Sequence, residues 1–121
     1  MDQGVIYFPS KPAIIASGVV AGPVEKKSVF AKDFDKFYDD ERAEEDSNEK
    51  GHQTMAEQAC QIALQKAKIK QNDVDFLMSG DLVNQMTPSN FAAATLQIPY
   101  IGLFSACATA VSSVIIASLL T

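Results

Sequence analysis

Cys107 is the side chain of this sequence with the clearest potential for chemistry. It follows the apolar run at residues 100–104, which has the length of a buried strand, and it precedes a segment with helical spacing. At such a strand-to-helix junction, the helix dipole and unpaired backbone N–H groups favour the thiolate, which is the nucleophilic form of cysteine. A single cysteine ahead of a helix is more often buried and unreactive, so the spacing alone leaves both interpretations open.

The other groups that could do chemistry are few. Cys60 falls on the buried stripe of a predicted helix and is interpreted as a small core residue. His52, the one histidine, lies just ahead of that helix and is typical of an exposed side chain, not of a catalytic base. The two cysteines are far apart and lack metal-binding spacing, which predicts a reducing compartment, no disulfide and no metal centre.

These residues are carried by an alternating series of predicted strands and helices. Apolar runs bounded by turn residues indicate strands, and apolar residues at i, i+3, i+4 and i+7 indicate helices. The expected elements are strands at 5–8, 13–16, 74–79 and 100–104, and helices at 53–68, at 88–96 and from 106 onward. This order is typical of an α/β fold, in which crossover helices cover a parallel or mixed sheet.

Charge is distributed very unevenly along the chain. Residues 33–50 contain nine acidic and three basic side chains and carry a net charge of −6, whereas the whole chain carries −5. The segment is predicted to be a solvated acidic loop, because it lacks the glycine and the ordered ligand positions of a calcium-binding loop. The sequence has no basic stripe, which argues against a nucleic-acid partner.

The last forty residues, 82–121, contain no Asp, Glu, Lys or Arg. Such a segment belongs either in a membrane or in the interior of a larger structure, because charged side chains are the ones least often buried. The window 100–120 is about long enough to span a bilayer, but it contains several hydroxyl side chains and has no flanking basic residue. A buried core position is therefore favoured, and a small membrane-anchored protein is the alternative.

Residues 101–109, Ile-Gly-Leu-Phe-Ser-Ala-Cys-Ala-Thr, resemble the active-cysteine segment of the thiolase and ketoacyl synthase superfamily. Five further blocks narrow the resemblance to the stage V sporulation protein AD family. These blocks are residues 21–26, 34–38, 55–57, 63–66 and 79–85, the last with the sequence Ser-Gly-Asp-Leu-Val-Asn-Gln. The resemblance keeps its order and covers nearly the whole chain from about residue 5.

The resemblance implies a thiolase-like fold that serves binding instead of catalysis. Members of this family are expected to bind dipicolinic acid (pyridine-2,6-dicarboxylate), alone or with calcium, and to support its uptake into the spore and its release on germination. They are expected to act with other sporulation proteins of a membrane complex in the forespore or spore. Their place there is cytoplasmic or peripheral at the inner spore membrane. Apart from that calcium, no cofactor is implied.

The resemblance also assigns site residues. Cys107 matches the pocket cysteine of the family. Asp81 and Asn84 follow the carboxyl end of the preceding predicted strand, where ligands gather in α/β sheets, and they are expected to belong to the same ligand-binding site. Ala108 stands where the family commonly has Ser, so one hydroxyl contact is expected to be missing.

Family members are much longer than this chain. Its 121 residues are therefore interpreted as a single, partial thiolase-like N-terminal domain with an acidic loop at 33–50, truncated in the helix after Cys107. The His and second Cys that a thiolase needs would lie outside the chain, so no catalytic residue is assigned. A homo-oligomer or a completing partner chain is expected to cover the apolar helix. The alternative is a fragment of a condensing enzyme that acts on acyl thioesters through Cys107.

Overall fold

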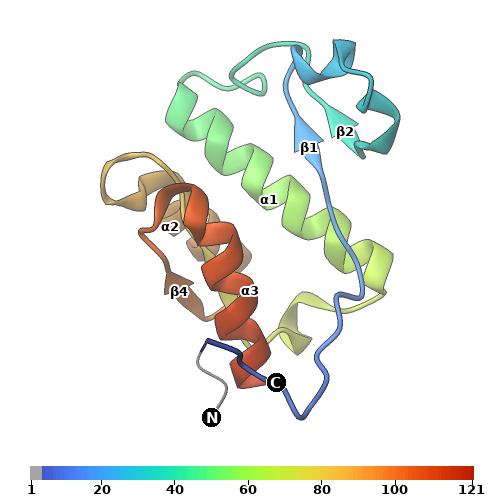
Figure 1. Cartoon of the computed structure of the whole chain (residues 1–121). Helices are drawn as coiled ribbons and strands as arrows, with labels where there is room; N and C mark the ends of the chain where they lie inside the picture. The colour runs from blue at the N-terminus through green and yellow to red at the C-terminus, as the bar shows by residue number, and fades with distance from the viewer. Residues whose placement is uncertain (1–3) are drawn as a thin grey trace.

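The computed structural model of the chain describes residues 4–121 and has an α/β architecture (Figure 1). Short 3-10 turns lie between its main elements. In chain order these elements are β1 (Val20–Ala21), β2 (Lys36–Phe37), α1 (Asn48–Ala67), β3 (Leu77–Ser79), α2 (Thr87–Leu96), β4 (Tyr100–Gly102) and α3 (Thr109–Leu120). The predicted α/β class is confirmed, as is the alternation of helices and strands from α1 onward.

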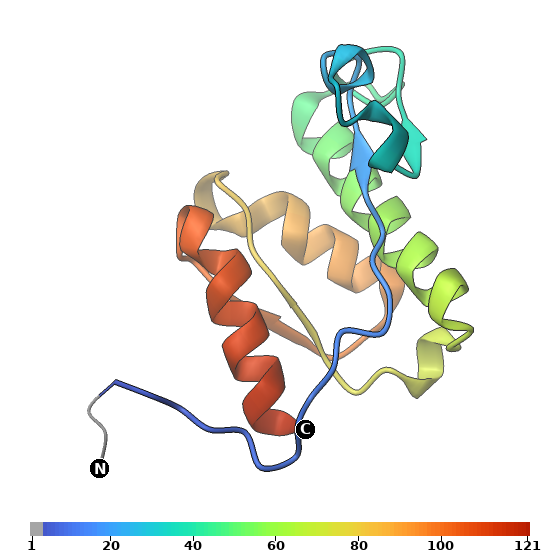
Figure 2. The ribbon, with the colours of Figure 1, turned by 45° about the vertical axis from the view of Figure 1, so that its right-hand side comes forward.

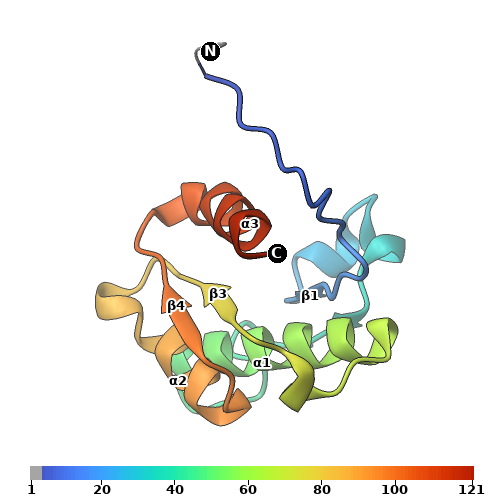
Figure 3. The same cartoon turned by 90° about the horizontal axis from the view of Figure 1, so that it is seen from below.

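The strands β3 and β4 form a parallel pair on which the helices pack. Leu77 lies opposite Tyr100 and Ser79 lies opposite Gly102, and α2 makes the crossover between the two strands. The helices α1 and α2 lie on one side of the pair, and α3 lies on the other side (Figure 3). This is the layering expected when a helix joins two neighbouring parallel strands.

The core lies where α1 and α2 pack against each other and where α2 packs against β4. Small side chains on α2 allow the two helices to approach closely. The best-buried apolar residues of this region are Ala92, Ala93, Leu96 and Ile98. Cys60 on α1 is half-buried, and burial together with the charge of Glu57 raises the pKa of its thiol, as suits an unreactive packing residue.

The helix α1 begins five residues before the predicted start at residue 53. The Ser47 hydroxyl accepts a hydrogen bond of 3.1 Å from the Lys50 N–H and thereby caps the first turn. Gly51, a poor helix former, obscures this start in the sequence. In the structure its lack of a side chain is required, because a Cβ there would lie 2.3 Å from the Arg42 carbonyl oxygen.

The strands β1 and β2 form a second, smaller parallel pair, with Val20 opposite Lys36. Asp35 connects this pair to α1. One of its carboxylate oxygens accepts a hydrogen bond of 2.9 Å from the Val19 N–H, and the other lies 2.5 Å from the Lys66 ammonium. The contact with Lys66, followed by the hydrogen bond from Val19, lowers the pKa of Asp35 below its usual value.

The strands predicted at residues 5–8 and 13–16 are wrong, because neither segment pairs with another strand. Extended backbone becomes a strand only when a neighbouring chain accepts and donates its hydrogen bonds, and Pro9 and Pro12 have no N–H to donate. The segment instead runs as an extended trace past the C-terminal end of α3 (Figure 2). Its apolar side chains Ile14 and Ile15 are exposed.

The acidic segment at residues 33–50 is only partly a loop, because it contains β2 and the first residues of α1. Within it, the Asp40 carboxylate accepts hydrogen bonds of 2.6 Å from the Arg42 N–H and 2.9 Å from the Glu44 N–H, which close a tight turn. Tyr38 and Ala43 are buried and hold the segment against the rest of the molecule.

The helix α3 is apolar and poorly covered. It contains no charged residue, and four of its large side chains are more than half exposed: Val111, Val114, Leu119 and Leu120. Across residues 4–121, none of the helices has the length and apolar character needed to cross a membrane. The window 100–120 is divided into β4, a connecting turn and the 12-residue α3, so it does not form one continuous span.

Gly18 sets the distance between α1 and the chain that leads into β1. A Cβ at this position would lie 2.1 Å from the Ala59 carbonyl oxygen and 2.9 Å from the Ala63 backbone nitrogen. We therefore expect Gly18→Ala to lower the free energy of unfolding by at least about 2 kcal/mol, measured by urea denaturation. Gly22→Ala is the control, because the nearest atom to its Cβ would be 3.7 Å away. Equal effects of the two substitutions would show that the contact with α1 does not form.

Candidate ligand-binding site

The carboxyl ends of β3 and β4 form the edge that carries the predicted site residues. The Leu103 N–H donates a hydrogen bond of 2.9 Å to the Ser79 carbonyl and extends the parallel pair by one residue. Two loops leave this edge: residues 80–86 lead to α2, and residues 103–108 lead to α3. Because the two strands are parallel neighbours, both loops begin on the same side of the pair.

Gly80 brings these two loops into contact. A Cβ on Gly80 would lie 1.9 Å from the Leu103 carbonyl oxygen and 3.2 Å from the Thr109 Cγ2 atom, so only glycine fits at this position. Asp81 follows Gly80 directly, and Cys107 precedes Thr109 by two residues. The structure therefore brings together the two loops from which the predicted site residues come.

Cys107 is exposed and lies in the 3-10 turn Ala106–Ala108, immediately before α3. The predicted strand-to-helix junction is confirmed, and the alternative of a buried cysteine is wrong. Ala106 has a left-handed backbone with a φ of 48°, which is strained for a residue other than glycine.

The turn that carries Cys107 is held by the buried Thr109 hydroxyl. This hydroxyl donates a hydrogen bond of 3.2 Å to the Leu103 carbonyl and accepts one of 3.3 Å from the Ser105 N–H. The same side chain thus contacts Leu103 and Ser105 in the first half of the loop and, through its methyl group, the position of Gly80.

Asp81 is 6% exposed, and its carboxylate is directed at its own loop and at α2. One oxygen accepts a hydrogen bond of 2.8 Å from the Val83 N–H, and the other accepts one of 2.9 Å from the Ser89 N–H. Ser89 lies in the first turn of α2, whose N-cap residue, Met86, makes no side-chain cap. Asp81 therefore caps α2 from outside the helix, and both of its oxygens are engaged within the chain.

Electrostatics keep Asp81 in its charged form. Burial by itself raises the pKa of this carboxyl, but the Ser89 hydroxyl and the N–H groups of Ser89 and Val83 outweigh the burial. These hydrogen bonds, together with the positive charge of protonated His52, lower the pKa of Asp81 below its usual value. His52 is exposed, as predicted, yet it lies close enough to Asp81 to influence this charge.

Asn84 is exposed and begins the 3-10 turn Asn84–Met86. Its carbonyl accepts a hydrogen bond of 3.0 Å from the Thr87 hydroxyl. The next two residues, Gln85 and Met86, both have left-handed backbones, with φ values of 59° and 52°. Such strained backbone is held by its surroundings, here by the Asn90 side chain, which donates a hydrogen bond of 2.9 Å to the Gln85 carbonyl.

The sequence pattern marks neither Thr109 nor Tyr100 as part of this edge, since a Thr before a helix and a Tyr in a strand are ordinary. The Tyr100 hydroxyl donates a hydrogen bond of 3.1 Å to the Ser79 carbonyl. Burial, with a smaller contribution from the charge of Asp81, raises the pKa of the Tyr100 phenol. The one sequence signal that could have pointed to Thr109 is its place at the end of the Ala-Cys-Ala-Thr block at residues 106–109.

The exposed groups at the carboxyl ends of β3 and β4 determine which chemistry this edge can perform. It presents an exposed thiol, an accessible amide on Asn84 and the start of α3, where the helix dipole favours an anion. Across residues 4–121, no three His, Cys, Asp or Glu side chains lie close enough together to hold a metal ion. The arrangement suits the binding of a small anion or the attack of a thiol on a bound acyl group.

The fold and the loop edge define an α/β protein whose candidate site gathers around an exposed cysteine at a strand-to-helix junction. The family described as "Stage V sporulation protein AD (SpoVAD)" matches residues 2–121. Stage V sporulation protein AD of Bacillus subtilis (strain 168) is 38% identical over 105 residues, which cover 87% of this chain and 31% of that relative. The chain belongs to the stage V sporulation protein AD family, as its motifs predicted, and it spans about a third of the length of the curated relative.

The capping role of Asp81 predicts a pH-dependent contribution to stability. We expect Asp81→Asn to lower the free energy of unfolding at pH 7 by about 1 kcal/mol, because a charged acceptor at a helix N-terminus becomes neutral. The folded-state pKa of Asp81 lies below its unfolded value. Its contribution is therefore fully present above an unfolded pKa of about 3.9 and is lost as the pH falls through the folded pKa.

Urea unfolding of the wild type and of Asp81→Asn at pH 7 and near pH 3 measures this effect. The difference between the two proteins should shrink at the lower pH. Asp73→Asn is the matched control, because Asp73 is exposed and should give no comparable difference at either pH. A difference that stays constant with pH would show that the charge of Asp81 does not cap α2.

Proposed function

We propose that this chain forms part of a dipicolinate-binding site in a spore protein of thiolase-like fold. Such a protein would support the uptake of dipicolinic acid into the forespore and its release on germination. The observation that carries the proposal is the family match over residues 2–121, combined with the contact between the Asp81 and Cys107 loops at one strand edge. Dipicolinate is a small planar dianion, and an edge that presents a helix start suits one of its carboxylates.

The first carboxylate of dipicolinate would lie at the start of α3, next to Cys107. That helix begins without a side-chain cap, and its dipole favours an anion there. The Asn84 amide, accessible on the adjacent loop, would donate a further hydrogen bond. Asp81 would act by holding its loop and α2 in place, because both of its oxygens already accept hydrogen bonds.

The second carboxylate requires a positive charge that residues 82–121 do not contain. In the proposal this charge comes from a second copy of the chain, from a partner protein of a sporulation membrane complex, or from calcium chelated by dipicolinate itself. The exposed apolar side chains of α3 offer the surface on which such a chain would dock, since contiguous apolar patches mark interaction sites. The protein would then act in the cytoplasm or peripherally at the inner spore membrane.

The proposed function is binding without catalysis. The second candidate is a condensing enzyme that forms an acyl thioester on Cys107, and the observation in its favour is the exposed thiol at the strand-to-helix junction. The two functions place different demands on the sulfur. A nucleophile must react fast as a thiolate near neutral pH, whereas a pocket residue need only contact the ligand.

Alkylation with iodoacetamide, followed by mass spectrometry of the two cysteine peptides, separates these functions. We expect Cys107 to react faster than Cys60, because Cys107 is exposed while Cys60 is half-buried with a raised pKa. The binding function predicts that Cys107 reacts no faster than the cysteine of a short unstructured peptide at pH 7. A rate about tenfold or more above that peptide would favour the condensing enzyme.

Calorimetric titration of dipicolinate, with and without calcium, tests the ligand itself. We expect saturable binding that Cys107→Ala weakens by about threefold or more, because the substituted side chain lies beside the proposed carboxylate position. Cys60→Ala is the matched control and should leave the affinity unchanged, since Cys60 packs on α1. A folded chain that gives no saturable heat under either condition would contradict ligand binding by these residues.

A further inference from the structure

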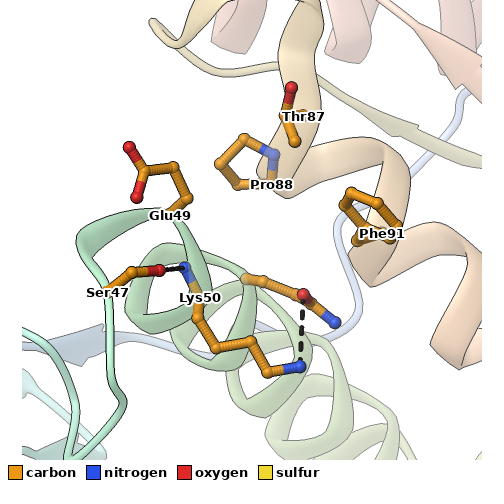
Figure 4. A pocket seen from close by; sticks show the side chains of 7 residues that line it. Ser47, Glu49, Lys50, Thr87, Pro88 and Phe91 are labelled. Atoms are coloured by element: carbon orange, nitrogen blue, oxygen red, sulfur yellow. Dashed lines mark hydrogen bonds between the residues drawn. The ribbon is translucent and has the colours of Figure 1, made fainter.

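A second candidate site lies between the first turns of α1 and α2. It is a cavity of about 310 Å³ whose lining does not include Cys107, Asp81 or Asn84. Its main walls are Glu49, Lys50 and Gln53 from α1, and Thr87, Pro88 and Phe91 from α2 (Figure 4). A volume of this size accommodates a small organic molecule.

One wall of this cavity is apolar and aromatic. Phe91 is 59% exposed although its ring is large, and it stands beside the buried Pro88. An aromatic side chain exposed at a hollow leaves apolar surface that a second ring can cover, and stacked rings attract each other beyond the area that they bury. The wall therefore favours a ligand with a planar apolar body.

The opposite wall carries a cation without a carboxylate partner among residues 4–121. The Lys50 ammonium lies 3.5 Å from the Gln53 side-chain oxygen, which is a long contact, and no carboxylate oxygen of the described residues lies within 4.0 Å of it. Gln53 is fixed in turn, because its amide donates hydrogen bonds to Glu57 at 2.7 Å and to Thr95 at 3.3 Å. A carboxylate entering the cavity would give Lys50 the partner that it lacks.

The remaining charge at the cavity limits the ligand to one negative charge. In Figure 4 the side chains of Glu49 and Lys50 extend away from each other, and the Glu49 carboxylate lies well apart from the Lys50 ammonium. Its charge repels a second anionic group, whereas the Lys50 ammonium attracts the first.

We propose that the cavity between α1 and α2 binds a small aromatic monocarboxylate. The carboxylate pairs with the Lys50 ammonium, and the ring lies against Phe91 and Pro88. The ligand differs from dipicolinate in charge, and the cavity is separate from the Cys107 edge, so this site stands independently of the function proposed above.

Benzoate is the probe, titrated into the 121-residue chain while backbone amide NMR signals are followed. We expect saturable shifts at Lys50, Gln53 and Phe91. Lys50→Gln should weaken binding by about threefold to fivefold, as for one partly exposed ion pair, and Phe91→Ala should weaken it by about threefold or more. Both side chains are exposed, so neither substitution should unfold the chain.

Matched controls separate the cavity from general effects of charge and surface area. Lys27→Gln and Phe30→Ala remove an exposed cation and an exposed ring outside the cavity, and both should leave the benzoate affinity unchanged. Cys107→Ala should also leave it unchanged, which distinguishes this site from the dipicolinate site.

A dianionic probe tests the role of Glu49. Isophthalate, the 1,3-dicarboxylate of benzene, should bind more weakly than benzoate, and Glu49→Gln should reduce that difference. The proposal is overturned if a folded chain shows no saturable shifts with benzoate. It is equally overturned if Lys27→Gln weakens binding as much as Lys50→Gln does, or if isophthalate binds the wild type as tightly as benzoate.

Discussion

The candidate site depends on the close approach of two backbones at the carboxyl edge of β3 and β4. Because Gly80 has no side chain, the Leu103 carbonyl lies directly against it. This contact fixes the positions of Gly80 and Leu103, which are the first residues of the two loops. Thr109 packs on the same point and donates a hydrogen bond to the same carbonyl. The position of Cys107 in its turn therefore follows from an interaction between backbone groups, which a side chain at position 80 would prevent.

Asp81 extends this constraint from the loop to the helix behind it. Its two oxygens join the Val83 N–H in the loop to the Ser89 N–H in α2, so the charge that stabilises the helix start also sets the loop conformation. A buried carboxylate tolerates this position because hydrogen bonds to its charged form outweigh the cost of burial. In the proposed site, a carboxylate that is engaged in this way would shape the loop without contacting the ligand.

Two features of the described residues leave room for a docked chain: the apolar surface of α3 is exposed, and the loops at the carboxyl ends of β3 and β4 carry no cation. A cavity of about 320 Å³ also separates Pro12–Ile14 from the last turns of α3. A docked chain would cover the apolar surface and could carry the cation, so the partner proposal and the ligand proposal support each other.

Local patterns in the sequence were sufficient for the α/β class, for the order of elements from α1 onward and for the family, because periodicity and short motifs lie within a few consecutive residues. They failed at 5–8 and 13–16, where β-forming residues alone do not make a strand without a pairing neighbour. They named Asp81 and Cys107 but not the inward direction of the Asp81 carboxylate, its proximity to His52 or the support from Thr109. The tertiary structure alone decided these points and the cavity between α1 and α2, because each joins residues far apart in the chain, whose contacts leave no periodic signal.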